Sequence, residues 1–252
     1  MPPRSAAAEV ANEAKSQRKI KALIYGPPKH GKTVFLGSGV LDERTRPMAI
    51  LDFEGGVLDV LEGLPGGPNG PDWYHIPISS WEDFNVAYER LQKNEEGFKS
   101  VAIDSLSEVH VFALMNLLDD PGIRRDAKDR DLIHQQDYGK AMVQMRRLTR
   151  SFRDLPLHVF YTAHHKEDVD SKEGLVKMVN LSGKLATEIP GMMSLVGYLA
   201  LTQDDEGKTQ RVLLLQNYAK IRTGVRTAWG IEAPDEISDP TVTNVLDALH
   251  YE

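Results

Sequence analysis

The sequence predicts an α/β fold with a mostly parallel central sheet, helices on both faces and a C-terminal antiparallel hairpin. Short apolar runs alternate with longer helical patterns over most of the chain, an order typical of a parallel sheet. Residues 195–201 and 211–215 instead flank the turn-rich segment 204–207, which is the pattern of a β-hairpin. We expect one core over 19–230, preceded by a flexible arm over 1–18 and followed by an acidic tail with a short helix over 231–252.

Each predicted strand is a short apolar run that stops at a polar residue or at a turn. In chain order these runs are 20–25, 48–53, 74–78, 100–104 and 156–163. Helical patterns lie over 81–92, where two preceding serines supply the N-cap, after Asp104 through Leu118, and over 137–153. The polar segments 119–136 and 164–184 are predicted to be exposed loops.

Composition excludes several classes of protein. The 252 residues contain no Cys, so disulfide frameworks, zinc ribbons, iron–sulfur clusters and cysteine nucleophiles are ruled out. No apolar run is long enough to span a membrane, and residues 1–21 lack a signal-peptide core, which predicts a cytoplasmic protein. The formal net charge of −7 argues against a chain coated by nucleic acid, but segments 140–153 and 208–226 contain basic residues and no acidic ones.

The most specific motif is Gly26-Pro27-Pro28-Lys29-His30-Gly31-Lys32-Thr33, which fits G-x-x-x-x-G-K-[ST] between a strand and a helix. The glycines permit a loop whose N–H groups converge on phosphate oxygens, while the two prolines donate none. Lys32 is expected to reach the β- and γ-phosphates, and the Thr33 hydroxyl to bind Mg²⁺. The predicted nucleotide contacts are Gly26, Lys29, His30, Gly31, Lys32, Thr33 and Val34.

Carboxylates at two other strand ends are candidates for the remaining parts of the predicted nucleotide site. Asp104 ends the run 100–104 and is expected to hold Mg²⁺ with Thr33, although it could simply cap the following helix. Glu54 follows the run 48–53 and is expected to activate the attacking water, although it could simply be an acid at the N-terminus of a helix. Asp52 is a weaker candidate for that role, because it could merely cap the strand end.

Two further groups are candidates for sensing or completing the site. Thr162 and His164 lie at the tip of a central strand, where a polar group can detect the γ-phosphate, or they simply begin a surface loop. Lys220 and Arg222 would share one face of an extended segment. They could stabilise transition-state charge on a neighbouring subunit's nucleotide, or form a solvated basic hairpin.

The order of these parts resembles the RecA-like recombinase core of P-loop ATPases. Within it, the chain most resembles the compact phage single-strand-annealing ATPases of the Sak type, often called phage nucleotide-binding proteins. The resemblance covers about 19–230. It implies ATP and Mg²⁺ as cofactors, Glu54 as the water-activating base, and a homo-oligomeric ring or filament with nucleotide between subunits, in which Lys220 and Arg222 act in trans.

The resemblance also implies single-stranded DNA as a partner, contacted by the segments 119–136 and 164–184. A single-strand DNA-binding protein would be a further partner, and the host cytoplasm the location. The candidate DNA contacts are Arg124, Arg125, Lys166, Lys172, Lys177 and Lys184. Neither segment is net basic, so we expect salt-sensitive, sequence-independent binding that depends on assembly.

Two other functions fit the same motifs. The chain could be a RecA-like ATPase that drives or regulates protein partners without binding DNA. It could also be a small-molecule kinase in which 119–136 acts as a lid.

Overall fold

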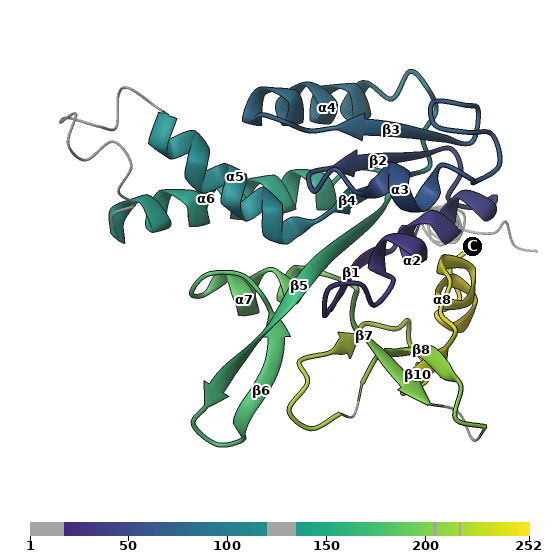
Figure 1. Cartoon of the computed structure of the whole chain (residues 1–252), viewed down its shortest axis with the longest axis vertical. Helices are drawn as coiled ribbons and strands as arrows, with labels where there is room; N and C mark the ends of the chain where they lie inside the picture. Colours follow the sequence, from purple (N-terminus) through teal and green to yellow (C-terminus); the bar gives the residue numbers. More distant parts are fainter. Residues whose placement is uncertain (1–17, 120–134, 204–205, 217) are drawn as a thin grey trace, which may run out of the picture.

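A computed structural model describes residues 18–119, 135–203, 206–216 and 218–252 of the chain (Figure 1). The predicted arm up to residue 17 lies outside the described residues. So do Arg124 and Arg125, two of the residues expected to contact DNA.

One sheet forms the centre of the described structure. Its strands are β1 (Lys21–Gly26), β2 (Met48–Asp52), β3 (Trp73–Pro77), β4 (Ser100–Asp104), β5 (His158–Asp170), β6 (Gly174–Val179), β7 (Leu195–Gln203), β8 (Thr209–Leu214), β9 (Gly224–Val225) and β10 (Glu236–Ser238). Their order is β10–β8–β7–β1–β5–β4–β2–β3, with β6 paired to β5 and β9 to β7. All pairs from β7 to β3 are parallel, and β8 and β10 add the antiparallel edge. This arrangement confirms the predicted fold class, including the hairpin formed by β7 and β8.

Helices cover both faces of the sheet. They are α2 (Lys32–Ser38), α3 (Val57–Leu61), α4 (Trp81–Lys93), α5 (Leu106–Asp119), α6 (Gln135–Arg153), α7 (Leu185–Glu188) and α8 (Val242–Ala248). Alternate residues of β1 point to opposite faces: Leu23 and Tyr25 join the core under α4, α5, α6 and α7, whereas Ala22 and Ile24 join the core under α2, α3 and α8. None of the described helices combines the length and apolarity that crossing a bilayer requires.

The parallel register brings the functional strand ends to one edge of the sheet. Gly26, at the end of β1, is the register partner of His164 in β5. Asp52, at the end of β2, is the partner of Asp104 at the end of β4. Because β5 lies between β1 and β4, its residues Thr162 and His164 stand between the phosphate-loop strand and the strand that ends in Asp104, although β5 itself continues beyond them.

The segment 164–184 is not the loop that its polar composition predicts. Strand β5 continues to Asp170, and the run from His165 to Asp170 pairs antiparallel with β6 (Figure 1). In this ribbon the two strands satisfy each other's backbone groups, so charged residues are tolerated on the exposed positions. Val176, Met178 and Val179 of β6 are buried against the protein, which anchors one part of the ribbon.

The segment 231–252 contains the expected short helix, α8, but packs into the core instead of forming a separate tail. Strand β10 pairs with β8. Val242, Val245, Leu246 and Leu249 are all buried. Their spacing of three, four and seven residues places them on one face of a helix, and that face covers the sheet beside α2.

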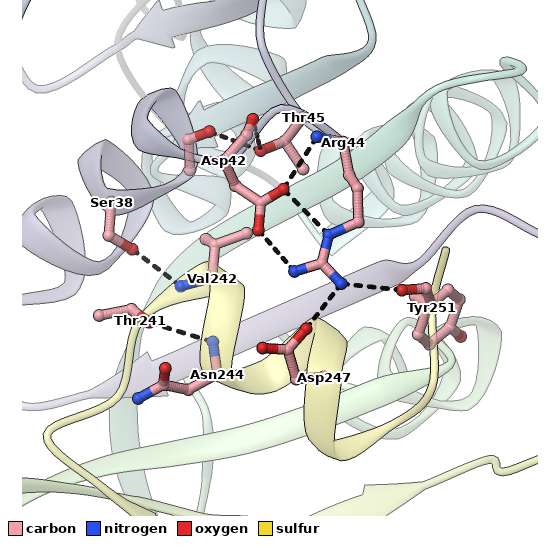
Figure 2. Close-up of polar contacts among 10 residues, drawn as sticks. Ser38, Asp42, Arg44, Thr45, Thr241, Val242, Asn244, Asp247 and Tyr251 are labelled. Atoms are coloured by element: carbon pink, nitrogen blue, oxygen red, sulfur yellow. Dashed lines mark hydrogen bonds and ion pairs between the residues drawn. The ribbon is translucent and has the colours of Figure 1, made fainter.

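A polar cluster ties this C-terminal segment to the chain that follows α2 (Figure 2). The backbone N–H at the start of α8 donates to Ser38 Oγ at 2.8 Å. Arg44 donates to both carboxylate oxygens of Asp42, at 2.9 and 2.6 Å. The same guanidinium donates to Asp247 of α8 at 2.7 Å and to the carbonyl of Tyr251 at 3.0 Å. The cluster therefore joins the two segments around one arginine.

Candidate functional site

The loop between β1 and α2 contains the predicted phosphate-binding motif. Gly31, immediately before α2, has φ of 94°, and Lys29 has φ of 63°. These left-handed residues allow the tight turn that the motif requires, at low cost for glycine. Lys29 is exposed and Val34 is exposed on the first turn of α2, while His30 is half-buried and burial lowers its pKa.

Lys32 is folded back inside this loop. Its side chain is buried, and Nζ donates to the carbonyl oxygens of Gly26 at 3.2 Å and of Pro27 at 2.9 Å. Burial lowers the pKa of Lys32, while the carboxylates of Glu54 and Asp104 act in the opposite direction. The ammonium is thus positioned within the loop by acceptors that a phosphate oxygen can replace.

Asp104 is the buried acid of the site. Thr33 Oγ1 donates to Asp104 Oδ2 at 2.7 Å, and Thr162 Oγ1 donates to the other carboxylate oxygen. Burial raises the pKa of Asp104; the two hydroxyls oppose this, while the nearby charges of Glu54 and Asp52 add to it. The predicted pair of magnesium ligands, Thr33 and Asp104, is therefore brought into direct contact.

Asp52 organises the turn that follows β2. Its buried carboxylate accepts from the N–H groups of Gly55 at 2.7 Å and Val57 at 3.1 Å. His75 Nε2 lies 3.0 Å from the same carboxylate. These three contacts engage both carboxylate oxygens of Asp52. Glu54 lies in the turn that they hold in place.

Glu54 is paired with His164 across the edge of the sheet. Its Oε1 lies 3.3 Å from His164 Nε2, and about a third of its side chain is exposed. The contact with His164 lowers the pKa of Glu54, the charge of Lys32 adds to this, and partial burial opposes it. The backbone N–H of His164 donates to Ser107 Oγ at 3.0 Å, which fixes this part of β5 against α5.

Lys220 and Arg222 lie beside β6 rather than beside the phosphate loop of their own chain. The carbonyl of Lys220 accepts from the N–H of Lys177 at 2.7 Å, and the N–H of Arg222 donates to the carbonyl of Lys177 at 3.0 Å. The Arg222 guanidinium forms ion pairs with Asp170 at 2.9 Å and with Glu173 at 3.0 Å. Lys220 is exposed, and its ammonium has no hydrogen-bond or ion-pair partner among the described residues.

The described lysines expected to contact DNA occupy the β5–β6 hairpin and the start of α7: Lys166, Lys172, Lys177 and Lys184. The ammonium of Lys166 donates to the carbonyl of Leu181 at 2.8 Å. That of Lys177 lies 5.5 Å from the ring centre of Tyr198. Lys172 and Lys184 are exposed.

Comparison with known families identifies the group to which this site belongs. The profile of a family described as an AAA domain matches residues 18–227. This chain belongs to the AAA domain family. The match includes the ends of β1, β2, β4 and β5 that form the site, so the motif 26–33 lies in the setting of a P-loop ATPase.

Other comparisons give less detail about this AAA domain. A solved structure, the KaiC-like protein of the hyperthermophilic archaeon Pyrococcus horikoshii, is 12% identical to it. That alignment covers 88% of this chain and 89% of the other, with a TM-score of 0.44. No curated protein is a significant match.

The residues of the AAA domain site fit a nucleotide with Mg²⁺. Mg²⁺ prefers oxygen ligands and uses few from the protein, which suits the Thr33 hydroxyl and the Asp104 carboxylate.

Sequence reasoning missed the supporting residues His75 and Ser107. A histidine inside a strand and a serine inside a helix give no local signal, because their partners lie 23 and 57 positions away.

Proposed function

We propose that this protein binds and hydrolyses ATP with Mg²⁺. The observation that carries the proposal is the convergence of Lys32, Thr33, Asp104 and Glu54 at one sheet edge. Lys32 would exchange its contacts with loop carbonyls for phosphate oxygens. Thr33 and Asp104 would hold Mg²⁺, which supplies positive charge that offsets the charge of the phosphates.

Glu54 is the group that we assign to water activation. A carboxylate kept ionised by His164 and Lys32 can accept a proton from water as the water oxygen attacks the γ-phosphorus. The bond from that phosphorus to the bridging oxygen breaks, and ADP leaves. His164 positions Glu54 and does not itself receive the proton in this scheme.

The test of hydrolysis is phosphate release from ATP by the full chain with Mg²⁺. Wild type is expected to release phosphate, and Lys32→Ala to lose both nucleotide affinity and turnover. Lys93→Ala, at the end of α4 on the other side of the sheet, is the control and should behave as wild type. A wild type that neither binds nor hydrolyses ATP would overturn the proposal.

We further propose that the protein binds single-stranded DNA through the β5–β6 hairpin and promotes annealing or recombination. Strand β5 passes the nucleotide site at His164 and continues into the hairpin, and the N–H of Asn180 donates to the carbonyl of His164 at 2.9 Å. Arg222 forms ion pairs with two acids of the hairpin, Asp170 and Glu173. These pairs offset the negative charge next to Lys172, so the surface around Lys172 repels DNA phosphates less. These contacts support a DNA surface whose placement depends on nucleotide.

Fluorescence anisotropy of a labelled oligonucleotide, at low salt with ATP and Mg²⁺, tests this role. We expect binding that weakens with added salt and in the variant Lys172→Ala/Lys184→Ala. Lys93→Ala/Lys99→Ala, which removes two exposed lysines outside the hairpin, is the control for the same change in net charge. No binding at micromolar protein would exclude the DNA role while leaving ATP hydrolysis intact.

One observation favours a second candidate, an ATPase that drives or regulates protein partners. The formal charge of −7 disfavours a surface coated by nucleic acid. Turnover separates the two functions, because single-stranded DNA should accelerate phosphate release only if DNA is the partner.

A further inference from the structure

Strands β7 and β8 extend beyond the end of β1 and pass beside the phosphate loop. Tyr25 of β1 is the register partner of Tyr198 in β7, so Leu199 and Leu201 continue past it. Gly26 approaches this extension closely: a Cβ built on Gly26 would lie 2.5 Å from the carbonyl oxygen of Leu199. The hairpin therefore forms a wall along one side of the motif.

Arg211 projects from this wall onto Gly31 of the phosphate loop. A Cβ built on Gly31 would overlap Nε of Arg211, and would lie 3.0 Å from its Cδ and 3.1 Å from its Cζ. The guanidinium thus lies against the bare Cα of Gly31. The φ of 94° favours glycine at this position, and the absence of a Cβ allows the Arg211 side chain to approach this closely.

The backbone of Arg211 is held by β7 on one side and by the residue after β10 on the other. Arg211 is the register partner of Leu201 in β7. On its other side, the N–H of Asp239 donates to the Arg211 carbonyl at 2.8 Å. An arginine carried by a strand between two partners is presented in a defined position, which reduces the entropy lost when its side chain binds a ligand.

The positive charge of Arg211 has no ion-pair partner within the described structure. Arg211 is exposed, and its guanidinium has no carboxylate partner among the residues that the structure describes. By contrast, Arg44, Arg146 and Arg222 all form ion pairs. A guanidinium against a phosphate loop, with no acid to neutralise it, is available to an anion in that loop.

The composition of the loop increases the need for such a donor. Pro27 and Pro28 have no N–H, so two positions of the motif contribute nothing to a phosphate cradle. A guanidinium carries five N–H donors in a planar fork that matches phosphate oxygens. Arg211 can therefore compensate for donors that the two prolines remove.

We propose that Arg211 is a phosphate-binding residue for the nucleotide held by its own chain. The inference rests on the proposed nucleotide-binding function and extends it to a residue 180 positions beyond Gly31 along the chain. Arg211 binds the phosphate chain from the side of the β7–β8 hairpin, while Lys32 binds it from within the loop.

Titration of a fluorescent ATP or ADP analogue into the full chain tests this role. Arg211→Ala and Arg211→Gln should weaken binding of both nucleotides about tenfold to a hundredfold, as expected for a lost hydrogen bond to a charged group. Arg211→Lys should retain part of the affinity, because it keeps the charge but loses the fork. Arg46→Ala, at a surface arginine paired with Glu43, is the matched control and should bind as wild type.

Two further readouts separate phosphate binding from a structural role. Arg211 variants should unfold at the wild-type temperature without nucleotide, because the side chain is exposed. Their nucleotide affinity should also fall less steeply with added NaCl than that of wild type, since one cation is missing. A structural role would change the first readout and leave the second unchanged.

The possible failures are distinguishable. If wild type binds nucleotide, Lys32→Ala does not, and Arg211→Ala binds as tightly as wild type, then this inference is overturned and the proposed function stands. If wild type binds no nucleotide at all, both the proposed function and the role of Arg211 are overturned.

Discussion

Asp52 and Glu54 lie two residues apart at the end of β2 and have different surroundings. Asp52 is buried and accepts from Gly55 and Val57 within its own turn. Glu54 is partly exposed and faces His164 and Lys32. We therefore assign Asp52 the structural role of holding the turn and Glu54 the role of activating water. The sequence alone shows only two carboxylates at the end of one strand.

Replacing Asp52 tests this division. Asp52→Ala leaves two backbone donors and His75 without their acceptor, so the free energy of unfolding should fall by about 2–4 kcal/mol. Urea denaturation measures this change. Asp59→Ala, at an exposed position of α3, should alter stability by less than about 0.5 kcal/mol and serves as the control. Equal stability of the two variants would contradict the structural role of Asp52.

At the scale of elements, α8 and the chain after α2 form one unit around Arg44 (Figure 2). The hydrogen bond from Arg44 lowers the pKa of Asp42 to about 2, from an ordinary value near 3.8. A carboxyl group with a lowered folded-state pKa stabilises the fold above its unfolded pKa. That contribution is lost as the pH falls through the folded-state value.

Acid denaturation should therefore reveal the Asp42–Arg44 contact. Between about pH 4 and pH 2, wild type should lose about 1–2 kcal/mol more stability than Asp42→Asn, which has no carboxyl group to protonate. Urea titrations at pH 7, 4 and 2 measure this difference. Asp247→Asn removes the more exposed partner of Arg44 and should change stability by less than about 1 kcal/mol. A wild type and Asp42→Asn with parallel pH profiles would contradict the assignment.

Most strands and helices were predictable because their signals are local. The Ser80 cap is an example: its Oγ accepts from the Asp83 N–H at 3.1 Å at the start of α4. The hairpin of β5 and β6 was not predictable as such, because the run from His165 to Asp170 is mostly charged and its strand conformation depends on pairing with β6. The packing of α8 was obscured by the acidic residues around its apolar stripe.

The site shows the same contrast between local and distant signals. The motif 26–33 and the strand-terminal Asp104 were recognisable because their spacing carries the chemistry. The contact of Arg211 with Gly31 joins positions that only the sheet order brings together. Local pattern reasoning has no access to such a pair.

At the scale of the whole molecule, Arg222 is the residue that bears on whether the protein works as a homo-oligomer. Within one chain its guanidinium pairs with Asp170 and Glu173. We propose that in a homo-oligomer it reaches the nucleotide of a neighbouring subunit. Arg222→Ala should then lose turnover while binding ATP with nearly normal affinity.

Mixing two inactive variants tests that arrangement. A subunit carrying Lys32→Ala still offers Arg222, and a subunit carrying Arg222→Ala still offers Lys32, so mixed interfaces should recover part of the wild-type turnover. Each variant alone, at the same total concentration, is the control. No recovery in mixtures that do assemble would contradict a site shared between subunits.

We propose that the edge formed by β1, β4, β2 and β5 hydrolyses ATP through Glu54. The most direct measurement is a paired assay of ATP affinity and single-turnover phosphate release for Glu54→Gln, with Glu82→Gln as the matched control. We predict unchanged affinity and hydrolysis that is at least about a hundredfold slower for Glu54→Gln, because only the proton acceptor is lost. Hydrolysis at the wild-type rate by Glu54→Gln would contradict the account.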